Sequence, residues 1–218
     1  MALASFSRFH PPPPLHLRRP SASARASAPS VSPLPRALIE IEKSQVIACL
    51  RAPDGKLAME AACAALSGGI SVLEIVMSTP GVLEVIKGLQ KDHPSSVIGE
   101  ILVDIQDNEV LYIPGVMTPT EVLFAYTAGA RIVKVYPVSM LGGDKYISAL
   151  KKPFPHIPMV ASQGIATDSI ERYIGGGASA VVLSDAIFEK EAMRQRNFDE
   201  IKRLAYLATL HADRARRP

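Results

Sequence analysis

The chain has few of the residues that build metal centres and disulfide frameworks. Its 218 residues include two cysteines, Cys49 and Cys63, and five histidines, and no two histidines are spaced as metal ligands. The neighbours of both cysteines are apolar, which is typical of small core residues in a reducing compartment. The sequence therefore disfavours a metal enzyme and offers no disulfide framework.

Long apolar runs and nucleotide-binding glycine motifs are also missing. No run approaches the roughly 18 consecutive apolar residues of a membrane-spanning helix, so we expect no membrane partner. The glycine-rich fingerprint of dinucleotide sites and the phosphate loop of nucleotide hydrolases are both absent from the sequence. With 48% hydrophobic and 21% charged residues, the composition is that of an ordinary globular protein, and its length fits one domain.

Acidic residues are missing from the first 39 positions, and the first acid is Glu40. The first 36 residues carry five of the 24 Lys and Arg residues, which leaves 19 basic against 21 acidic residues, a net charge of −2, for the remainder. The overall charge of +3 therefore belongs to the N-terminal segment, and we expect no nucleic-acid partner.

Residues 1–36 are rich in Ser, Ala, Pro and Arg and contain no apolar stretch long enough for a secretory signal. This composition is typical of an organellar transit peptide, and the dominance of Ser, Ala and Pro favours the chloroplast (plastid stroma) over the mitochondrion. The alternative is a disordered tail, because a polar, proline-rich segment buries too little surface to fold. We assign residues 1–36 to a disordered transit peptide and residues 37–218 to one barrel domain.

From Leu38 onward, short apolar runs alternate with helical patterns. The expected strands are Val46–Leu50, Val72–Met77, Val97–Gly99, Leu111–Val116, Ile132–Pro137, Pro158–Ser162 and Ala180–Ser184. The expected helices are Lys56–Leu66, Val82–Lys91, Thr120–Thr127, Lys145–Leu150, Asp168–Ile174 and Asn197–Leu210. Strands that alternate with helices indicate βαβ units and an α/β fold with a parallel sheet.

A weak internal repeat relates three of these units. In each, a helix ends, a glycine follows and a strand begins. The copies are GISVLE from Gly69, GARIVK from Gly129 and GASAVV from Gly177. Their sixth residues are Glu74, Lys134 and Val182, and equal depth along equivalent strands places Glu74 and Lys134 on the same side at the same level.

Lys134 is the single charge in the run IVKVYP at 132–137. A parallel strand enclosed on both faces is almost continuously apolar, so a lysine there needs a partner or a lowered pKa. The alternative places Lys134 on an edge strand, facing water. Together with Glu74, Lys134 forms either a catalytic pair, in which the lysine is the nucleophile and the glutamate the acid/base, or a buried salt bridge. The residues alone leave both alternatives open.

Four stretches resemble the class I aldolases of the 2-keto-3-deoxy-6-phosphogluconate aldolase family, with the related 4-hydroxy-2-oxoglutarate aldolases, in a plant-like, organelle-targeted form. They are GGISVLEIVMST at 68–79, YIPGVMTPTEV at 112–122, AGARIVKVYPVSMLGG at 128–143 and MVASQGI at 159–165. The resemblance implies a (β/α)₈ TIM barrel, incomplete here with seven recognisable strands, and a site at its carboxyl end. It also implies reversible cleavage of a 2-keto-4-hydroxy acid to pyruvate and an aldehyde, no cofactor, and a homotrimer.

The same resemblance implies roles for six residues. Lys134 forms the Schiff base with the ketone, and Glu74 shuttles protons. Ser162 helps to bind the carboxylate of pyruvate. Substrate binding, including the loops that hold a phosphate in the family, falls to Gln163, Gly164 and Ser184.

Three positions depart from the family pattern. Ser78 stands where the family has an arginine, Gln163 stands where bacterial members have a glycine, and Asp185 lies near their phosphate-binding serine. An acid beside a phosphate is unfavourable. A shorter, unphosphorylated keto acid therefore fits this chain better.

The spacing of the strands shows a gap after Gly99. The step from Val97 to Leu111 is 14 residues, whereas the other five steps are 21 to 26 residues. A crossover needs about 10–12 residues beyond its strand, and the sequence that follows Gly99 resembles the tail of the next helix in the family. We therefore expect that about one helix and one strand are missing.

Two hypotheses follow: an active aldolase, and a catalytically impaired isoform or regulatory subunit of the same family. A different barrel enzyme, such as a phosphosugar epimerase, ranks below both. It would need a metal or paired acids at the strand ends, and the sequence shows neither.

Overall fold

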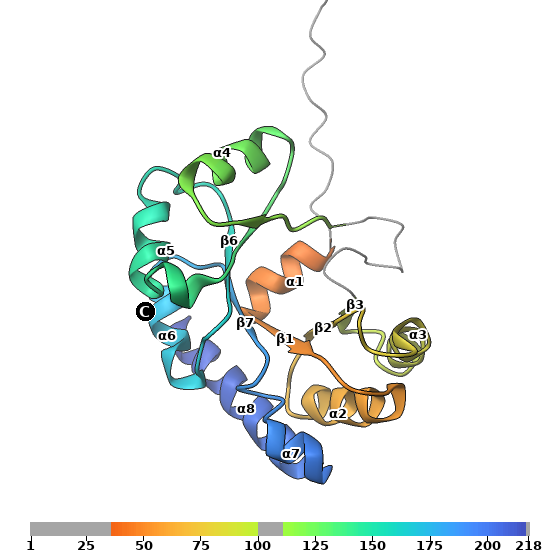
Figure 1. Cartoon of the computed structure of the whole chain (residues 1–218). Helices are drawn as coiled ribbons and strands as arrows, with labels where there is room; N and C mark the ends of the chain where they lie inside the picture. Colours follow the sequence, from red (N-terminus) through yellow and green to blue (C-terminus); the bar gives the residue numbers. More distant parts are fainter. Residues whose placement is uncertain (1–35, 100–110, 217–218) are drawn as a thin grey trace, which may run out of the picture. The chain divides into compact units, whose positions relative to one another are not determined.

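The computed structural model describes residues 36–99 and 111–216, which belong to one unit spanning Leu34–Pro218 (Figure 1). The predicted transit peptide falls outside the described residues except for Arg36, the first residue of helix α1. The segment from 100 to 110 also lies outside them.

The strands form one parallel sheet, as the alternating pattern predicts. They are β1 (Val46–Leu50), β2 (Val72–Ile75), β3 (Val97–Gly99), β4 (Gly115–Val116), β5 (Val133–Val135), β6 (Met159–Ser162) and β7 (Ala180–Leu183). Their hydrogen-bonded order is β3-β2-β1-β7-β6-β5-β4. All seven expected strands are confirmed, most with shorter bounds, and β4 keeps only the last two residues of its predicted range.

Helices alternate with these strands. They are α1 (Arg36–Ser44), α2 (Gly55–Ser67), α3 (Val82–Asp92), α4 (Pro119–Thr127), α5 (Asp144–Lys151), α6 (Ile170–Gly175), α7 (Lys190–Gln195) and α8 (Phe198–Ala215), with short 3₁₀ turns η1 (Val138–Leu141) and η2 (Thr167–Ser169). The six expected helices are present. Helices α1 and α7 were not predicted. Helix α7 is short and has few apolar residues to mark its period, whereas α1 has an amphipathic pattern, with Ala37, Leu38 and Ile41 buried, that the prediction did not use.

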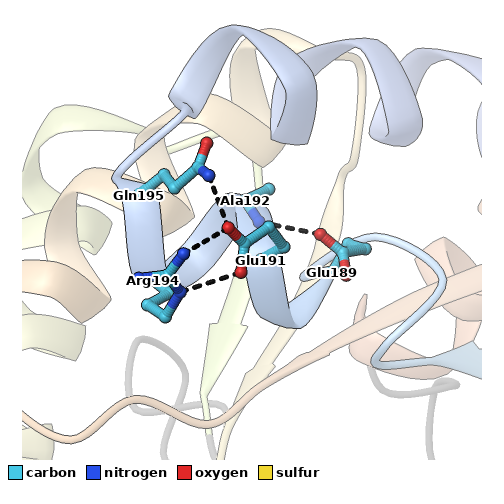
Figure 2. Close-up of polar contacts among 5 residues, drawn as sticks. All are labelled: Glu189, Glu191, Ala192, Arg194 and Gln195. Carbon is cyan, nitrogen blue, oxygen red and sulfur yellow. Dashed lines mark hydrogen bonds and ion pairs between the residues drawn. The ribbon is translucent and has the colours of Figure 1, made fainter.

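Side-chain caps fix several helix starts. Asp54 accepts a hydrogen bond from the Leu57 amide at 2.8 Å at the start of α2, and Thr118 and Glu121 form a reciprocal capping box at the start of α4. Figure 2 shows the start of α7, where Glu189 accepts from the Ala192 amide at 2.7 Å. This cap fixes the start of α7 at Lys190.

The outer face of the sheet packs against the helices, and α2 packs against α8 (Figure 1). Gly68, at the end of α2, permits this approach: a Cβ there would lie 2.5 Å from the carbonyl oxygen of Lys202 and 2.6 Å from the Cβ of Ala205. A side chain at this position would therefore separate the two helices.

The inner face of the sheet has its own apolar cluster. It includes Ile47, Val72, Val160 and Val182 from four strands, and Ile132, which directly precedes β5. Helix α1 closes the amino-terminal side of this interior, because its buried residues Ala37, Leu38 and Ile41 belong to the same cluster. The unpredicted helix thus contributes to the core rather than to the surface.

The order of the described strands ends at β3 on one side and at β4 on the other. These are the two strands that flank the predicted gap after Gly99. The discontinuity inferred from strand spacing therefore coincides with the ends of the hydrogen-bonded order.

Candidate active site

The central pair of the site is Lys134 on β5 and Glu74 on β2. The Nζ atom of Lys134 lies 3.6 Å from Oε2 of Glu74, and the two side chains are 14% and 9% exposed. The predicted meeting of these residues at one level of the interior is confirmed. The edge-strand alternative for Lys134 is wrong, because β5 is hydrogen-bonded to both β4 and β6.

This contact shows that the sheet is curled. Strands β1, β7 and β6 separate β2 from β5 in the hydrogen-bonded order. In a flat sheet, four steps of about 4.8 Å would set the two strands ~19 Å apart, beyond the combined reach of the side chains. The sheet therefore wraps around its inner face, as the wall of a barrel does.

Cys49 is a third member of this group. It pairs in register with Glu74 across β1 and β2, and its thiol and the Glu74 side chain share a hydrogen bond. Burial, and then the negative charge of Glu74, raise the pKa of the Cys49 thiol to about 12, so it stays protonated and can donate to the carboxylate. Cys49 was interpreted as a core residue, but it lines the site cavity. Its alternation with Ile47 on β1 is the signal that places it on the inner face.

A cavity of about 490 Å³ opens at the carboxyl ends of the strands, above the Lys134–Glu74 pair. All six residues predicted for the site line it: Glu74, Lys134, Ser162, Gln163, Gly164 and Ser184. Sequence reasoning missed three further polar or charged wall residues, Cys49, Arg51 and Tyr136. Parallel strands bring their carboxyl ends to one edge, which is where such sites form.

Ser162 is the last residue of β6 and is buried. Lys134 pairs in register with Val160, so Ser162 lies one same-face step closer to the cavity mouth. Lys134 and Ser162 line the same cavity. Ser184 follows β7, the strand next to β6, and is exposed in the cavity wall.

The turn after β6 has an unusual backbone. Gln163 has φ of 86° and Gly164 has φ of 70°, so a non-glycine residue occupies the left-handed region. The Gln163 side chain accepts a hydrogen bond from the Ser139 hydroxyl, which ties this turn to η1. A Cβ on Gly164 would lie 2.5 Å from Oγ of Ser139, so only glycine fits there.

Asp185 brings a second carboxylate to the cavity wall. Its Oδ2 lies 3.9 Å from Nζ of Lys190, and both side chains are largely exposed. Such an exposed pair contributes little to stability, but it sets the charge at the rim. Ser78, where the family has an arginine, is exposed after the end of β2.

Within residues 36–99 and 111–216, no group of three or more His, Cys, Asp or Glu side chains is placed to hold a metal ion. In the same part of the chain, no helix combines the length and apolar character of a membrane span.

Comparison with known proteins supports the resemblance. A family model described as "KDPG and KHG aldolase" matches residues 100–204. The 2-dehydro-3-deoxy-phosphogluconate aldolase of Pseudoalteromonas atlantica is 26% identical over 195 residues, covering 77% of this chain and 91% of the relative. The corresponding enzyme of Pseudomonas aeruginosa is 24% identical over 167 residues, covering 64% and 76%.

The same comparisons reveal a net gap in this chain. The match to the P. atlantica enzyme spans 195 residues, yet 77% of 218 is about 168, so about 27 residues of the relative have no counterpart. The P. aeruginosa match gives the same difference, because 64% of 218 is about 140 against 167 residues. A loss of this size fits one helix, one strand and their connections.

Solved structures agree with the fold. The KDPG aldolase of Legionella pneumophila, with pyruvate captured as a covalent carbinolamine, superposes with a TM-score of 0.69 at 22% identity, covering 79% of this chain and 97% of that one. The 2-keto-3-deoxy-6-phosphogluconate aldolase of Zymomonas mobilis gives a TM-score of 0.66 at 21% identity, covering 79% and 96%. The matching family model, the curated relatives and this fold together support placing the chain in the KDPG and KHG aldolase family.

Proposed function

We propose that this chain is a class I aldolase that cleaves a 2-keto-4-hydroxy acid to pyruvate and an aldehyde through a Schiff base on Lys134. Its homologues are aldolases, which supports aldol chemistry on a keto acid. The observation that carries the mechanism is the contact between Lys134 and Glu74 at the floor of an open cavity. An amine beside a carboxylate is the arrangement that imine chemistry requires.

The reaction begins at the amine. Glu74 accepts a proton from Lys134, and the neutral nitrogen attacks the C2 ketone to give a carbinolamine. Loss of water, with the hydroxyl protonated by Glu74, leaves an iminium.

The iminium then accepts the electron pair of the breaking bond. Glu74 removes the proton of the 4-hydroxyl, and the C3–C4 bond breaks. The aldehyde leaves, and the electron pair of the broken bond forms an enamine. Protonation of C3 regenerates the iminium, and water hydrolyses it to release pyruvate and free Lys134.

We further propose an unphosphorylated substrate of the 4-hydroxy-2-oxoglutarate type. Asp185 in the cavity wall repels a dianionic phosphate, and the Gln163 side chain occupies a turn that bacterial members keep as glycine. In this proposal, the Ser162 hydroxyl, the turn at Gly164 and Ser184 after the neighbouring strand face the anionic groups of the substrate.

A homotrimer in the plastid stroma completes the proposal. One structural relative is a cage designed by fusing symmetric oligomeric domains, which supports self-association of this fold. Exposed apolar side chains on and beside α4 give a surface for it, with Phe124 76% exposed and Tyr112 59% exposed. Light scattering on the purified chain measures the oligomeric state, and imaging of a fluorescent fusion tests the location.

The net gap of about 27 residues favours a second candidate, a catalytically impaired isoform of the same family. One experiment separates the two. The full chain is incubated with pyruvate and borohydride, and the site of modification is mapped by peptide mass spectrometry. Reduced pyruvate on Lys134 supports the aldolase.

Two variants control this experiment. Lys134→Ala should abolish the adduct, whereas Lys190→Ala, which removes an exposed lysine at the rim, should retain it. A folded wild-type chain that takes up no label would support the impaired isoform. Equal labelling of Lys134→Ala would show that another amine reacts.

A further inference from the structure

Cys49 is the residue that β1 sets beside Glu74. The two residues pair in register across β1 and β2, and neighbouring strands lie about 4.8 Å apart. On the other side of β2, the residue opposite Glu74 is Gly99 of β3, which has no side chain. Of the two strands that flank β2, only β1 therefore supplies a side chain at the level of this carboxylate.

The Glu74 carboxylate has donors on two strands. Nζ of Lys134, on β5, lies 3.6 Å from Oε2, and the Cys49 thiol on β1 shares a hydrogen bond with the same side chain. Burial, and then the negative charge of Glu74, raise the pKa of this thiol to about 12, although the positive charges of Lys134 and Arg51 act in the opposite direction. The thiol keeps its proton, and an ionised carboxylate can only accept, so Cys49 is the donor.

The proposed reaction makes this second donor useful. Glu74 takes and returns protons in several steps, but Lys134 has no positive charge while its nitrogen is neutral, as in the free amine and the carbinolamine. The thiol stays protonated through all of these steps. It can therefore hold the carboxylate when the partner charge on β5 is absent.

We propose that Cys49 is a positioning residue for the acid/base steps: its S–H group holds the Glu74 carboxylate beside Lys134 and favours the ionised form. This inference rests on the function proposed above. A donor to the charged form of a carboxylate stabilises that form. Without the donor, Glu74 should bind its proton more tightly and point less consistently at the reacting nitrogen.

The test is the rate at which the full chain forms a reduced pyruvate adduct with sodium cyanoborohydride, read by mass spectrometry across a range of pH. Cys49→Val fills the space of the thiol without a donor, whereas Cys49→Ser keeps a donor. At saturating pyruvate, Cys49→Val should react about three- to tenfold more slowly than the wild type, because one hydrogen bond is lost. Cys49→Ser should recover most of that rate.

The pH profile separates positioning from packing. The acidic limb should move about half a unit to higher pH in Cys49→Val and stay in place in Cys49→Ser. Both variants keep the other titratable or charged groups that line the cavity, so the shift reports the thiol. These groups are Glu74, Lys134, Arg51, Tyr136 and Asp185.

The pyruvate dependence gives a second separation. The half-saturating concentration should change less than twofold in either Cys49 variant, because the thiol acts through Glu74. Cys63→Ser, on α2 and outside the site cavity, should match the wild type throughout. A Cys49→Val protein with the wild-type rate and pH profile would overturn the inference. Equal slowing of Cys49→Val and Cys49→Ser would also overturn it, since the loss would not follow the donor.

A third measurement does not depend on catalysis. In a Cys63→Ser background Cys49 is the only thiol of the chain, and infrared spectroscopy reads its S–H stretch. The band should move to higher frequency in Glu74→Gln, because a neutral amide accepts less strongly than a carboxylate. A chain that forms no adduct but shows this shift would reject the proposed function and support the hold of Cys49 on Glu74. A band that does not move would reject the inference, whether or not the adduct forms.

Discussion

Lys134 and Glu74 are 60 positions apart in the chain and have three strands between them in the sheet, yet their charged atoms lie 3.6 Å from each other. The contact exists because the sheet curls around its inner face. It places the only charged pair among the described inner-face residues at the floor of the cavity.

The buried pair should show strong coupling in stability. Glu74→Gln removes the negative partner of the Lys134 ammonium. Lys134→Met removes the positive partner of the Glu74 carboxylate. Each single change should lower the free energy of unfolding by about 3 kcal/mol, and the double variant should lose less than the sum. Urea denaturation of the wild type and the three variants completes the cycle. Additive losses would mean that the two charges do not interact.

Gly164→Ala should destabilise the turn after β6. Its φ of 70° disfavours a side chain, and the new Cβ would meet Ser139. We expect a loss of about 2 kcal/mol in the free energy of unfolding, measured in urea. Adding Ser139→Gly removes the clash but not the backbone strain, so it should restore only part of the loss. A fully tolerated Gly164→Ala would contradict this geometry.

Gln163 gives a complementary test, because it is a side-chain-bearing residue with φ of 86°. Both Gln163→Gly and Gln163→Ala remove the hydrogen bond from Ser139. They differ in backbone strain, so the glycine variant should be more stable than the alanine variant by about 1 kcal/mol. Thermal or urea unfolding of the matched pair measures the difference, and the reverse order would show that the left-handed turn is absent in solution.

Cys49 should resist alkylation. At pH 9 a thiol with a pKa of 9.0 is half ionised, whereas a pKa of about 12 leaves about one thiolate in a thousand. In a Cys63→Ser background, iodoacetamide should label folded protein at least tenfold more slowly than urea-unfolded protein. Glu74→Gln should speed labelling of the folded chain, because it removes a negative charge that raises the pKa.

The raised pKa of the Cys49 thiol also predicts the direction in which the free energy of unfolding changes with pH. The pKa of this thiol is higher in the folded chain than in the unfolded chain. The contribution of Cys49 to stability is therefore fully present below pH 9 and is lost as the pH rises toward about 12. Cys49→Val should therefore lose less stability than the wild type between pH 8 and pH 10. An identical slope in both proteins would contradict the raised pKa.

Local patterns predicted the strands and the helices flanking the site, because burial on two faces leaves short apolar runs and burial on one face leaves a helical period. Matched depth in the repeat also predicted the pairing of Glu74 with Lys134. Helices α1 and α7 were missed, and α7 has only six residues in which to show a period. Strand β4 was predicted, but only two residues of its range are hydrogen-bonded as a strand.

The sequence by itself determined the order of elements, the gap after Gly99 and the two residues at the centre of the site, since each is written in spacing along one strand or helix. The tertiary structure decided what those residues meet. Only the curl of the sheet brings β2 opposite β5 and sets Ser139 against Gln163. These contacts depend on curvature and register among strands distant in sequence, and no local pattern encodes them.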